Sequence, residues 1–244
     1  MKRLKILVVN DDGILSPGIE RLARNAARFG EVWVAAPASQ CSGMSQRLSI
    51  SGTLTLEEPA FPALVNGAYA IGGTPADCVK VALKSLLPVK PDFVFSGINF
   101  GYNTGYDIAY SGTVGAAMEA VMNGIPAIAF STQHDGSYDV TDKYIEQITE
   151  ELISAPPAPG EIWNVNFPGC PLEEFKGILR DRTPAPMCVF ENYYSKSVQA
   201  DGPALLTPYA VQLRDGDAPE GTDIHDVVNG WISVGKVKSM VVNP

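Results

Sequence analysis

The sequence predicts an α/β protein built on a parallel sheet with helices on both faces. In the first 155 residues, short apolar runs of strand length alternate with segments of helical periodicity. This alternation is typical of parallel sheets with helical crossovers, and a run that is almost wholly apolar, such as residues 4–9, is typical of a buried strand. A length of 244 residues and an apolar fraction of 45% allow one large domain, or one domain with an appendage.

The elements of this first part follow one another in a regular order. The predicted strands lie at residues 4–9, 32–36, 48–56, 63–71, 92–96 and 127–131. The predicted helices lie at residues 17–29, 75–87, 113–123 and about 139–154. The helix boundaries rest on local signals, since Ser16 and Thr74 can cap helix starts, a proline follows each of them, and Gly30 can end the first helix.

The proline-rich segment at residues 156–160 marks a change in composition. Beyond it helical periodicity is scarce, and strands are predicted at residues 162–166, 178–182, 188–194, 204–213 and 231–234. We therefore divide the chain into an α/β core at residues 1–155 and a β-rich part at residues 156–244. The β-rich part is expected to extend the first part or to pack on a partner.

Composition argues against several classes of protein. The formal net charge is −9, and such repulsion disfavours binding to a nucleic acid polymer or a membrane surface. The four cysteines show no C-x-x-C spacing and are interpreted as reduced thiols. No apolar run is long enough to span a bilayer, and the beginning of the chain lacks the apolar region and cleavage site of a signal peptide. We expect a cytoplasmic protein.

Two adjacent aspartates, Asp11 and Asp12, follow the first predicted strand directly and precede a glycine. Ligands of open α/β sheets bind beyond the carboxyl ends of the strands. Two neighbouring carboxylates repel each other, so the pair makes most sense if a hard cation lies between them. The alternative is a solvated Asp-Asp-Gly turn.

Loops rich in small and polar residues occupy residues 36–45, 96–107 and 110–119. Each alone is an ordinary loop, but together they bring oxygen donors and bare backbone to one end of the sheet. Asp11, Asp12, Asn99 and a serine hydroxyl are all oxygen ligands, which favour Mg²⁺, Mn²⁺ or Ca²⁺ over Zn²⁺.

The tripeptide Ser111-Gly112-Thr113 begins a predicted helix. Backbone N–H groups, hydroxyls and the positive end of the helix dipole suit a phosphate, although a plain helix cap is the alternative. A cation beside an anion cradle implies metal-assisted phosphoryl chemistry. The chain has no GxxxxGK[ST] segment and no GxGxxG turn after the first strand, which disfavours a Walker-type NTPase and dinucleotide binding.

Several longer motifs, taken together, resemble the survival protein E (SurE) family of metal-dependent nucleotidases. They occur in the family's order between residues 4 and 131, and the later segments at residues 164–168 and 221–233 are also similar. The motifs are NDDGILSPGI, SGMS, GTPADCV, SGINFGYNTGYDIAYSGTVGAAME and GIPAIAFS.

The resemblance implies a Rossmann-like three-layer sandwich with a β-rich C-terminal extension that swaps between subunits of a homodimer or homotetramer. It implies a phosphomonoesterase acting on nucleoside 5′- or 3′-monophosphates, in some members also on short polyphosphate, with one Mg²⁺ or Mn²⁺ per subunit. The implied metal ligands are Asp11, Asp12, Ser42 and Asn99. The implied phosphate-side residues are Gly43, Asn103, Ser111, Gly112 and Thr113.

In the mechanism that we expect, Asp11 holds the cation or acts as a general base. Ser111, Thr113 and Asn103 stabilise charge on the phosphoryl oxygens, and water or metal-bound solvent protonates the leaving group. Two alternatives compete. A haloacid-dehalogenase-type phosphatase would form an aspartyl phosphate but expects Asp-x-Asp, and a non-catalytic module would bind nucleotide without releasing phosphate.

The sequence departs from the family pattern at Cys41, at Ala120 and after Gly235. The first departure is expected to change contacts with the substrate. The other two leave the predicted site in place, but they make the alignment of the tail with the family pattern less specific. Two further acids have open roles. Glu119 either supports a loop as a buried acid or is solvated, and Asp77 is interpreted as an acid of the first helical turn.

Overall fold

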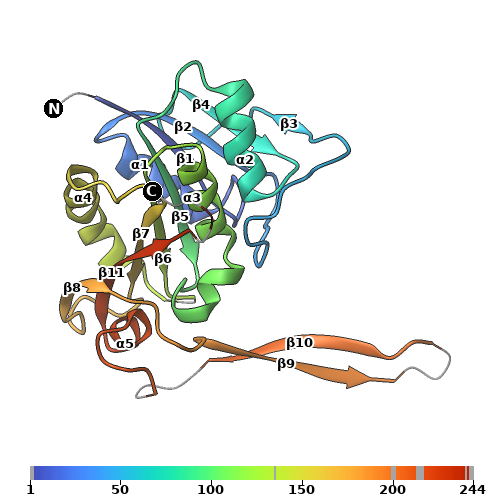
Figure 1. Ribbon diagram of the computed structural model, residues 1–244, viewed down its shortest axis with the longest axis vertical. Helices are drawn as coiled ribbons and strands as arrows, with labels where there is room; N and C mark the ends of the chain where they lie inside the picture. Colours follow the sequence, from blue (N-terminus) through green and yellow to red (C-terminus); the bar gives the residue numbers. More distant parts are fainter. Residues whose placement is uncertain (1–2, 135, 199–201, 213–216, 240, 242–244) are drawn as a thin grey trace.

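The computed structural model describes residues 3–134, 136–198, 202–212, 217–239 and 241. Within these residues, one nine-stranded sheet runs through the molecule in the order β3-β4-β2-β1-β5-β6-β7-β11-β8 (Figure 1). Its strands are β1 (Leu4–Val9), β2 (Gly30–Pro37), β3 (Leu56–Glu57), β4 (Gly67–Ile71), β5 (Phe93–Phe100), β6 (Ala127–Thr132), β7 (Glu161–Phe167), β8 (Gly177–Arg182) and β11 (Trp231–Lys238).

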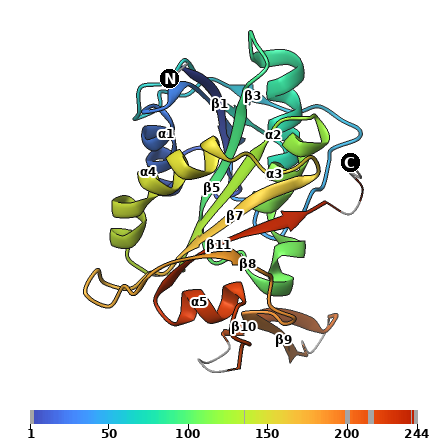
Figure 2. The same ribbon diagram turned by 60° about the vertical axis from the view of Figure 1, so that its left-hand side comes forward.

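Helices cover both faces of the sheet, which gives three layers (Figure 2). On one face α1 (Pro17–Ala26) and α4 (Asp139–Ser154) pack over a core that includes Ile6, Val8 and Phe130. On the other face α2 (Pro75–Val81) and α3 (Gly112–Met122) pack over a core that includes Leu7 and Val9. Alternate residues of β1 thus face opposite cores, as the period of a strand requires. The predicted α/β sandwich is confirmed.

The strand order reverses between β1 and β5. From β1 the chain moves outward to β2 and β4, and then returns to place β5 on the other side of β1. The pairs β1–β2, β1–β5 and β5–β6 are all parallel. Such a switch point opens a crevice at the carboxyl ends of the strands, where ligands of α/β sheets bind. Asp11 follows β1 and Asn99 lies near the end of β5, so both candidate ligands stand at this position.

The C-terminal part contributes to the same sheet. Strand β7 pairs in parallel with β6, and β11 pairs antiparallel with β7. A hairpin formed by β9 (Phe190–Ser197) and β10 (Leu205–Gln212) makes a separate two-stranded sheet within the residues described. Figure 1 shows this hairpin projecting far from the rest of the molecule. The last residue of the predicted strand 204–213 lies outside the described residues.

The structure differs from the predicted secondary structure at three places. Residues 48–55 form no strand, and only Leu56–Glu57 pairs, with β4. Helix α2 ends at Val81 and continues as one π-helical turn, Ala82–Leu86. The tail contains a helix that we did not predict, α5 (Asp223–Val228), whose six residues are too few to show a helical period. Among the residues described, no helix is long and apolar enough to cross a bilayer.

Candidate active site

Asp11 lies buried at the end of β1, with 3% of its surface exposed. The Thr113 hydroxyl donates a hydrogen bond of 2.5 Å to its Oδ1, and its backbone oxygen accepts one from the Cys41 N–H. Burial raises the pKa of the Asp11 carboxyl to about 6, against the opposing effect of the Thr113 hydrogen bond; the charge of Asp12 adds to the rise. An ionised Asp11 is therefore under-solvated, and a cation would relieve that cost.

Asp12 is partly buried and faces the end of β5. Its Oδ2 accepts a hydrogen bond of 3.0 Å from the backbone N–H of Phe100. Burial also raises the pKa of Asp12, although the Phe100 N–H and the nearby His134 oppose this effect. The alternative interpretation, a solvated Asp-Asp-Gly turn, does not hold for Asp11, because its side chain is buried.

Asn99 has its side chain oriented by its own loop. Its Nδ2 donates a hydrogen bond of 2.7 Å to the Gly101 backbone oxygen. An amide whose nitrogen is used in this way keeps its oxygen as an acceptor or metal ligand. The register of β5 against β6 shifts between Ser96 and Asn99, and bulges of this kind often re-aim side chains beside active sites.

Ser42 and Gly43 form an exposed turn after β2. The Ser42 hydroxyl accepts a hydrogen bond from Gln40 Nε2. Gly43 has a φ of +70°, which favours glycine, and a Cβ placed there would meet no atom within 4 Å, so a ligand can approach the backbone closely. The bond from the Cys41 N–H to the Asp11 backbone oxygen joins this turn to the end of β1.

The predicted metal ligands fit a hard divalent cation. Asp11 and Asp12 supply carboxylates, Asn99 supplies an oriented amide oxygen, and Ser42 supplies a hydroxyl. This all-oxygen donor set matches the preferences of Mg²⁺ and Mn²⁺. No cluster of three or more His, Cys, Asp or Glu side chains suited to a metal occurs in the described part of the chain.

The start of α3 lies directly against Asp11. Ser111 caps this eleven-residue helix by accepting from the Val114 N–H, and the Thr113 carbonyl is tied to β5 by the Ser96 hydroxyl. A Cβ on Gly112 would lie 3.0 Å from Oδ2 of Asp11, so only glycine fits there without a shift. The Gly112 and Thr113 N–H groups belong to the first turn, whose donors have no partner within a helix and can bind an anion.

Asn103 is buried and held by β7. Its N–H donates to Asn166 Oδ1 at 2.8 Å, and its carbonyl accepts from the Nδ2 atoms of both Asn164 and Asn166. Its own Nδ2 donates to Ser131. We had not assigned Asn164 and Asn166 to the site. The signal was present, because two asparagines at alternate positions of a buried strand demand polar partners.

His134 is a second neighbour that the sequence did not reveal. Its ring lies against Phe100, with 5.0 Å between the ring centroids, and its charge contributes to the electrostatic environment of Asp12. No motif surrounds it in the sequence, so only the structure could place it here.

The fold and the arrangement of the candidate residues together indicate a class: an α/β protein with oxygen donors suited to a hard cation next to a helix N-terminus suited to phosphate. The family model described as "Survival protein SurE" matches residues 6–185. The chain is 36% identical over 242 residues to a protein named "5'-nucleotidase SurE" from Heliobacterium modesticaldum, covering 98% of this chain and 88% of the relative. The crystal structure of the SurE protein from Aquifex aeolicus superposes with a TM-score of 0.80 at 34% identity, covering 98% of this chain and 95% of that one. The chain belongs to the SurE family.

Proposed function

We propose that this SurE-family protein is a metal-dependent phosphomonoesterase that hydrolyses nucleoside 5′-monophosphates to nucleoside and phosphate. The observation that carries the proposal is the direct contact between Asp11 and the first turn of α3. It puts a carboxylate that needs a cation beside a helix start that suits an anion. The name of the Heliobacterium modesticaldum relative, 5'-nucleotidase SurE, supports the choice of a 5′-nucleotide.

Each candidate residue has a role that follows from its surroundings. A bound Mg²⁺ or Mn²⁺ would supply Lewis-acid activation of the phosphoryl group. Asp11, Asp12, Ser42 and Asn99 would hold it, one ion per chain. The N–H groups of Gly112 and Thr113, together with Ser111 and Asn103, would bind the phosphoryl oxygens and stabilise the charge that builds on them. Gly43 would let the backbone approach the same group, because no atom lies within 4 Å of a Cβ placed there.

Asp11 is the candidate general base, in addition to being a ligand. Thr113 fixes the orientation of its carboxylate, as a positioned proton acceptor requires. No histidine lies within the motifs that carry the candidate site, so we assign protonation of the leaving group to solvent.

We further propose that the protein forms a homodimer or homotetramer through its hairpin. Tyr194, Leu206 and Tyr209 on β9 and β10 are exposed, and Tyr193 stacks on Tyr209 across the two strands. An isolated hairpin is at best marginally stable in water, so a partner that covers it would stabilise it. The four free cysteines suit a reducing compartment, and we propose the cytoplasm.

The proposed activity is tested by measuring phosphate release from a panel of nucleoside 5′- and 3′-monophosphates and short polyphosphates. Each substrate is assayed with Mg²⁺, with Mn²⁺ and with EDTA. We expect release from 5′-monophosphates with metal and none in EDTA, and the panel decides whether 3′-monophosphates are also cleaved. Nucleotide binding without release would indicate a binding module, and a trapped phospho-Asp11 would indicate a covalent mechanism.

A further inference from the structure

The exposed turn that carries Ser42 and Gly43 belongs to an irregular segment, residues 38–55, which lies between β2 and β3. Before the turn, the Cys41 N–H bonds to the Asp11 backbone oxygen. After the turn, the segment is held by Ser45, Gln46, Arg47 and Ser49, which we call the loop clamp. These residues come three to seven positions after Ser42 and join the segment to α2, to α3 and to the residues just before α3.

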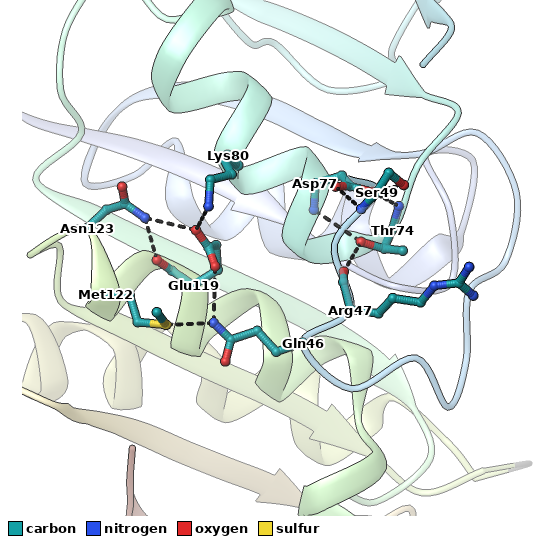
Figure 3. Close-up of polar contacts among 9 residues, drawn as sticks. All are labelled: Gln46, Arg47, Ser49, Thr74, Asp77, Lys80, Glu119, Met122 and Asn123. Carbon is teal, nitrogen blue, oxygen red and sulfur yellow. Dashed lines mark hydrogen bonds and ion pairs between the residues drawn. The ribbon is translucent and has the colours of Figure 1, made fainter. Parts of the chain in front are cut away.

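Gln46 joins the segment to α3 through Glu119. Gln46 Nε2 donates a hydrogen bond of 3.1 Å to Oε2 of Glu119, whose side chain is buried (Figure 3). The other carboxylate oxygen, Oε1, accepts from Lys80 Nζ at 3.3 Å and from Asn123 Nδ2 at 3.1 Å. Glu119 therefore presents a fixed acceptor to the loop, and it lies on the helix whose first turn forms the proposed phosphate cradle.

A second connection joins the segment to α2. Asp77 accepts from the N–H of Ser49 at 2.9 Å and from its hydroxyl at 2.7 Å, and Thr74 Oγ1 donates to the Arg47 carbonyl (Figure 3). Burial opposes ionisation of Asp77, but these hydrogen bonds together with those from Thr74 outweigh it and lower the pKa of the carboxyl. Asp77 is thus ionised at neutral pH and accepts strongly.

Ser45 fixes the third connection. Its N–H donates to the Tyr110 carbonyl at 2.9 Å and its hydroxyl to the Ala109 carbonyl at 2.8 Å. A Cβ on Gly115 would lie 2.1 Å from the Ser45 carbonyl oxygen, so the loop backbone packs tightly against α3. Three connections, to α3, to α2 and to the residues just before α3, hold residues 45–49 just beyond the Ser42–Gly43 turn.

We propose that Glu119 and Asp77 are positioning residues that hold the Ser42–Gly43 turn over the cation and phosphate through the loop clamp. This inference rests on the proposed function of Ser42 and Gly43. Without the clamp the turn would sample more conformations, and binding of metal and substrate would have to order it again. The clamp therefore governs the affinity for metal and substrate rather than the chemical step.

The test exchanges the amide of Gln46 on the loop with the carboxylate of Glu119 on α3, in two steps. Gln46→Glu places a second carboxylate against Glu119, and adding Glu119→Gln restores a donor–acceptor pair with the two groups exchanged. Lys84→Met is the matched control, because it removes an exposed lysine one turn further along the same helical segment, outside the contacts of Glu119 and of the loop clamp. The half-saturating Mn²⁺ concentration, KM for 5′-AMP and kcat at saturating Mn²⁺ are measured for each, and Mn²⁺ binding is measured separately by calorimetry.

We expect Gln46→Glu to raise the half-saturating Mn²⁺ concentration and KM about tenfold, the equivalent of one hydrogen bond to a charged group. The value of kcat stays close to that of the wild type. The double variant recovers the half-saturating Mn²⁺ concentration and KM, and Lys84→Met changes neither constant. If Gln46→Glu does not fold, Gln46→Leu is expected to shift the constants in the same direction.

Unchanged constants in Gln46→Glu, a loss confined to kcat, or failure of Glu119→Gln to rescue would overturn the proposal. Its failure can be told from failure of the proposed function. Calorimetry measures Mn²⁺ binding to the clamp variants even if the wild type releases no phosphate, and that absence of release would refute the nucleotidase activity instead.

Discussion

Replacing Asp11 by Asn is expected to stabilise the metal-free protein while it abolishes activity. Burial raises the pKa of this carboxyl from the ordinary value of 3.8 to about 6. At 1.36 kcal/mol per pKa unit, an ionised Asp11 lowers the free energy of unfolding at neutral pH by about 3 kcal/mol. Asparagine carries no charge, and its Oδ1 can still accept the hydrogen bond from Thr113, so the variant regains most of that energy.

The sign of the effect fixes its dependence on pH. The folded state holds the proton more tightly than the unfolded state, so the contribution of Asp11 to stability is fully present below pH 3.8 and is lost as the pH rises through about 6. The advantage of Asp11→Asn over the wild type is therefore about 3 kcal/mol at pH 7.5 and about half of that at pH 5.

Urea unfolding in EDTA at these two pH values measures the difference. Saturating Mn²⁺ should reverse the order of stability, because the wild type gains binding energy that the variant lacks. The reasoning would be refuted if Asp11→Asn were less stable than the wild type in EDTA at pH 7.5. It would also be refuted if the stability difference between variant and wild type were the same at pH 5 and pH 7.5.

Three further predictions concern the other parts of the site and the hairpin. Thr113→Val removes the hydroxyl that orients Asp11 and should lower activity toward 5′-AMP by about 10–100-fold, the scale for losing a group that orients a metal ligand, with Thr113→Ser as the control that keeps activity. Asn166→Leu leaves the buried Asn103 N–H unpaired and should lower the free energy of unfolding, measured in urea, by about 1–3 kcal/mol. It should also lower the rate of phosphate release. Wild-type stability and activity in this variant would contradict the role given to β7. The double variant Tyr194→Glu/Tyr209→Glu puts two charges on the exposed face of the hairpin and should lower the mass measured by light scattering to that of one chain. An unchanged mass would exclude the hairpin as the subunit interface.

Much of the core of the site could be predicted from sequence because it follows from topology. Parallel strands bring their carboxyl ends to one edge, so Asp11 and the start of α3 meet although about a hundred residues separate them. The starts of three helices could be predicted from local sequence, because a capping side chain stands directly before each helix. These residues are Ser16, Thr74 and Ser111.

Other features depend on contacts that no local pattern encodes. Residues 48–56 alternate in polarity like a strand, but Ile50 is 95% exposed and the Ser49 N–H bonds to the Asp77 side chain instead of a neighbouring strand. Glu119 had two equally open roles in the sequence, and only its three donors decide that it is a buried support for the loop. Distant partners of this kind appear only once the helices are packed.

The central claim is that Asp11, Asp12, Ser42 and Asn99 hold one divalent cation next to the start of α3. Calorimetric titration of the metal-free protein with Mn²⁺ tests it most directly. We compare the wild type with Asp12→Asn and Asn99→Leu, and with the surface control Asp142→Asn, whose side chain pairs with Arg21. The account predicts one Mn²⁺ per chain for the wild type and the control, and much weaker binding for both site variants. Binding in Asp12→Asn and Asn99→Leu that equals the wild type would contradict it.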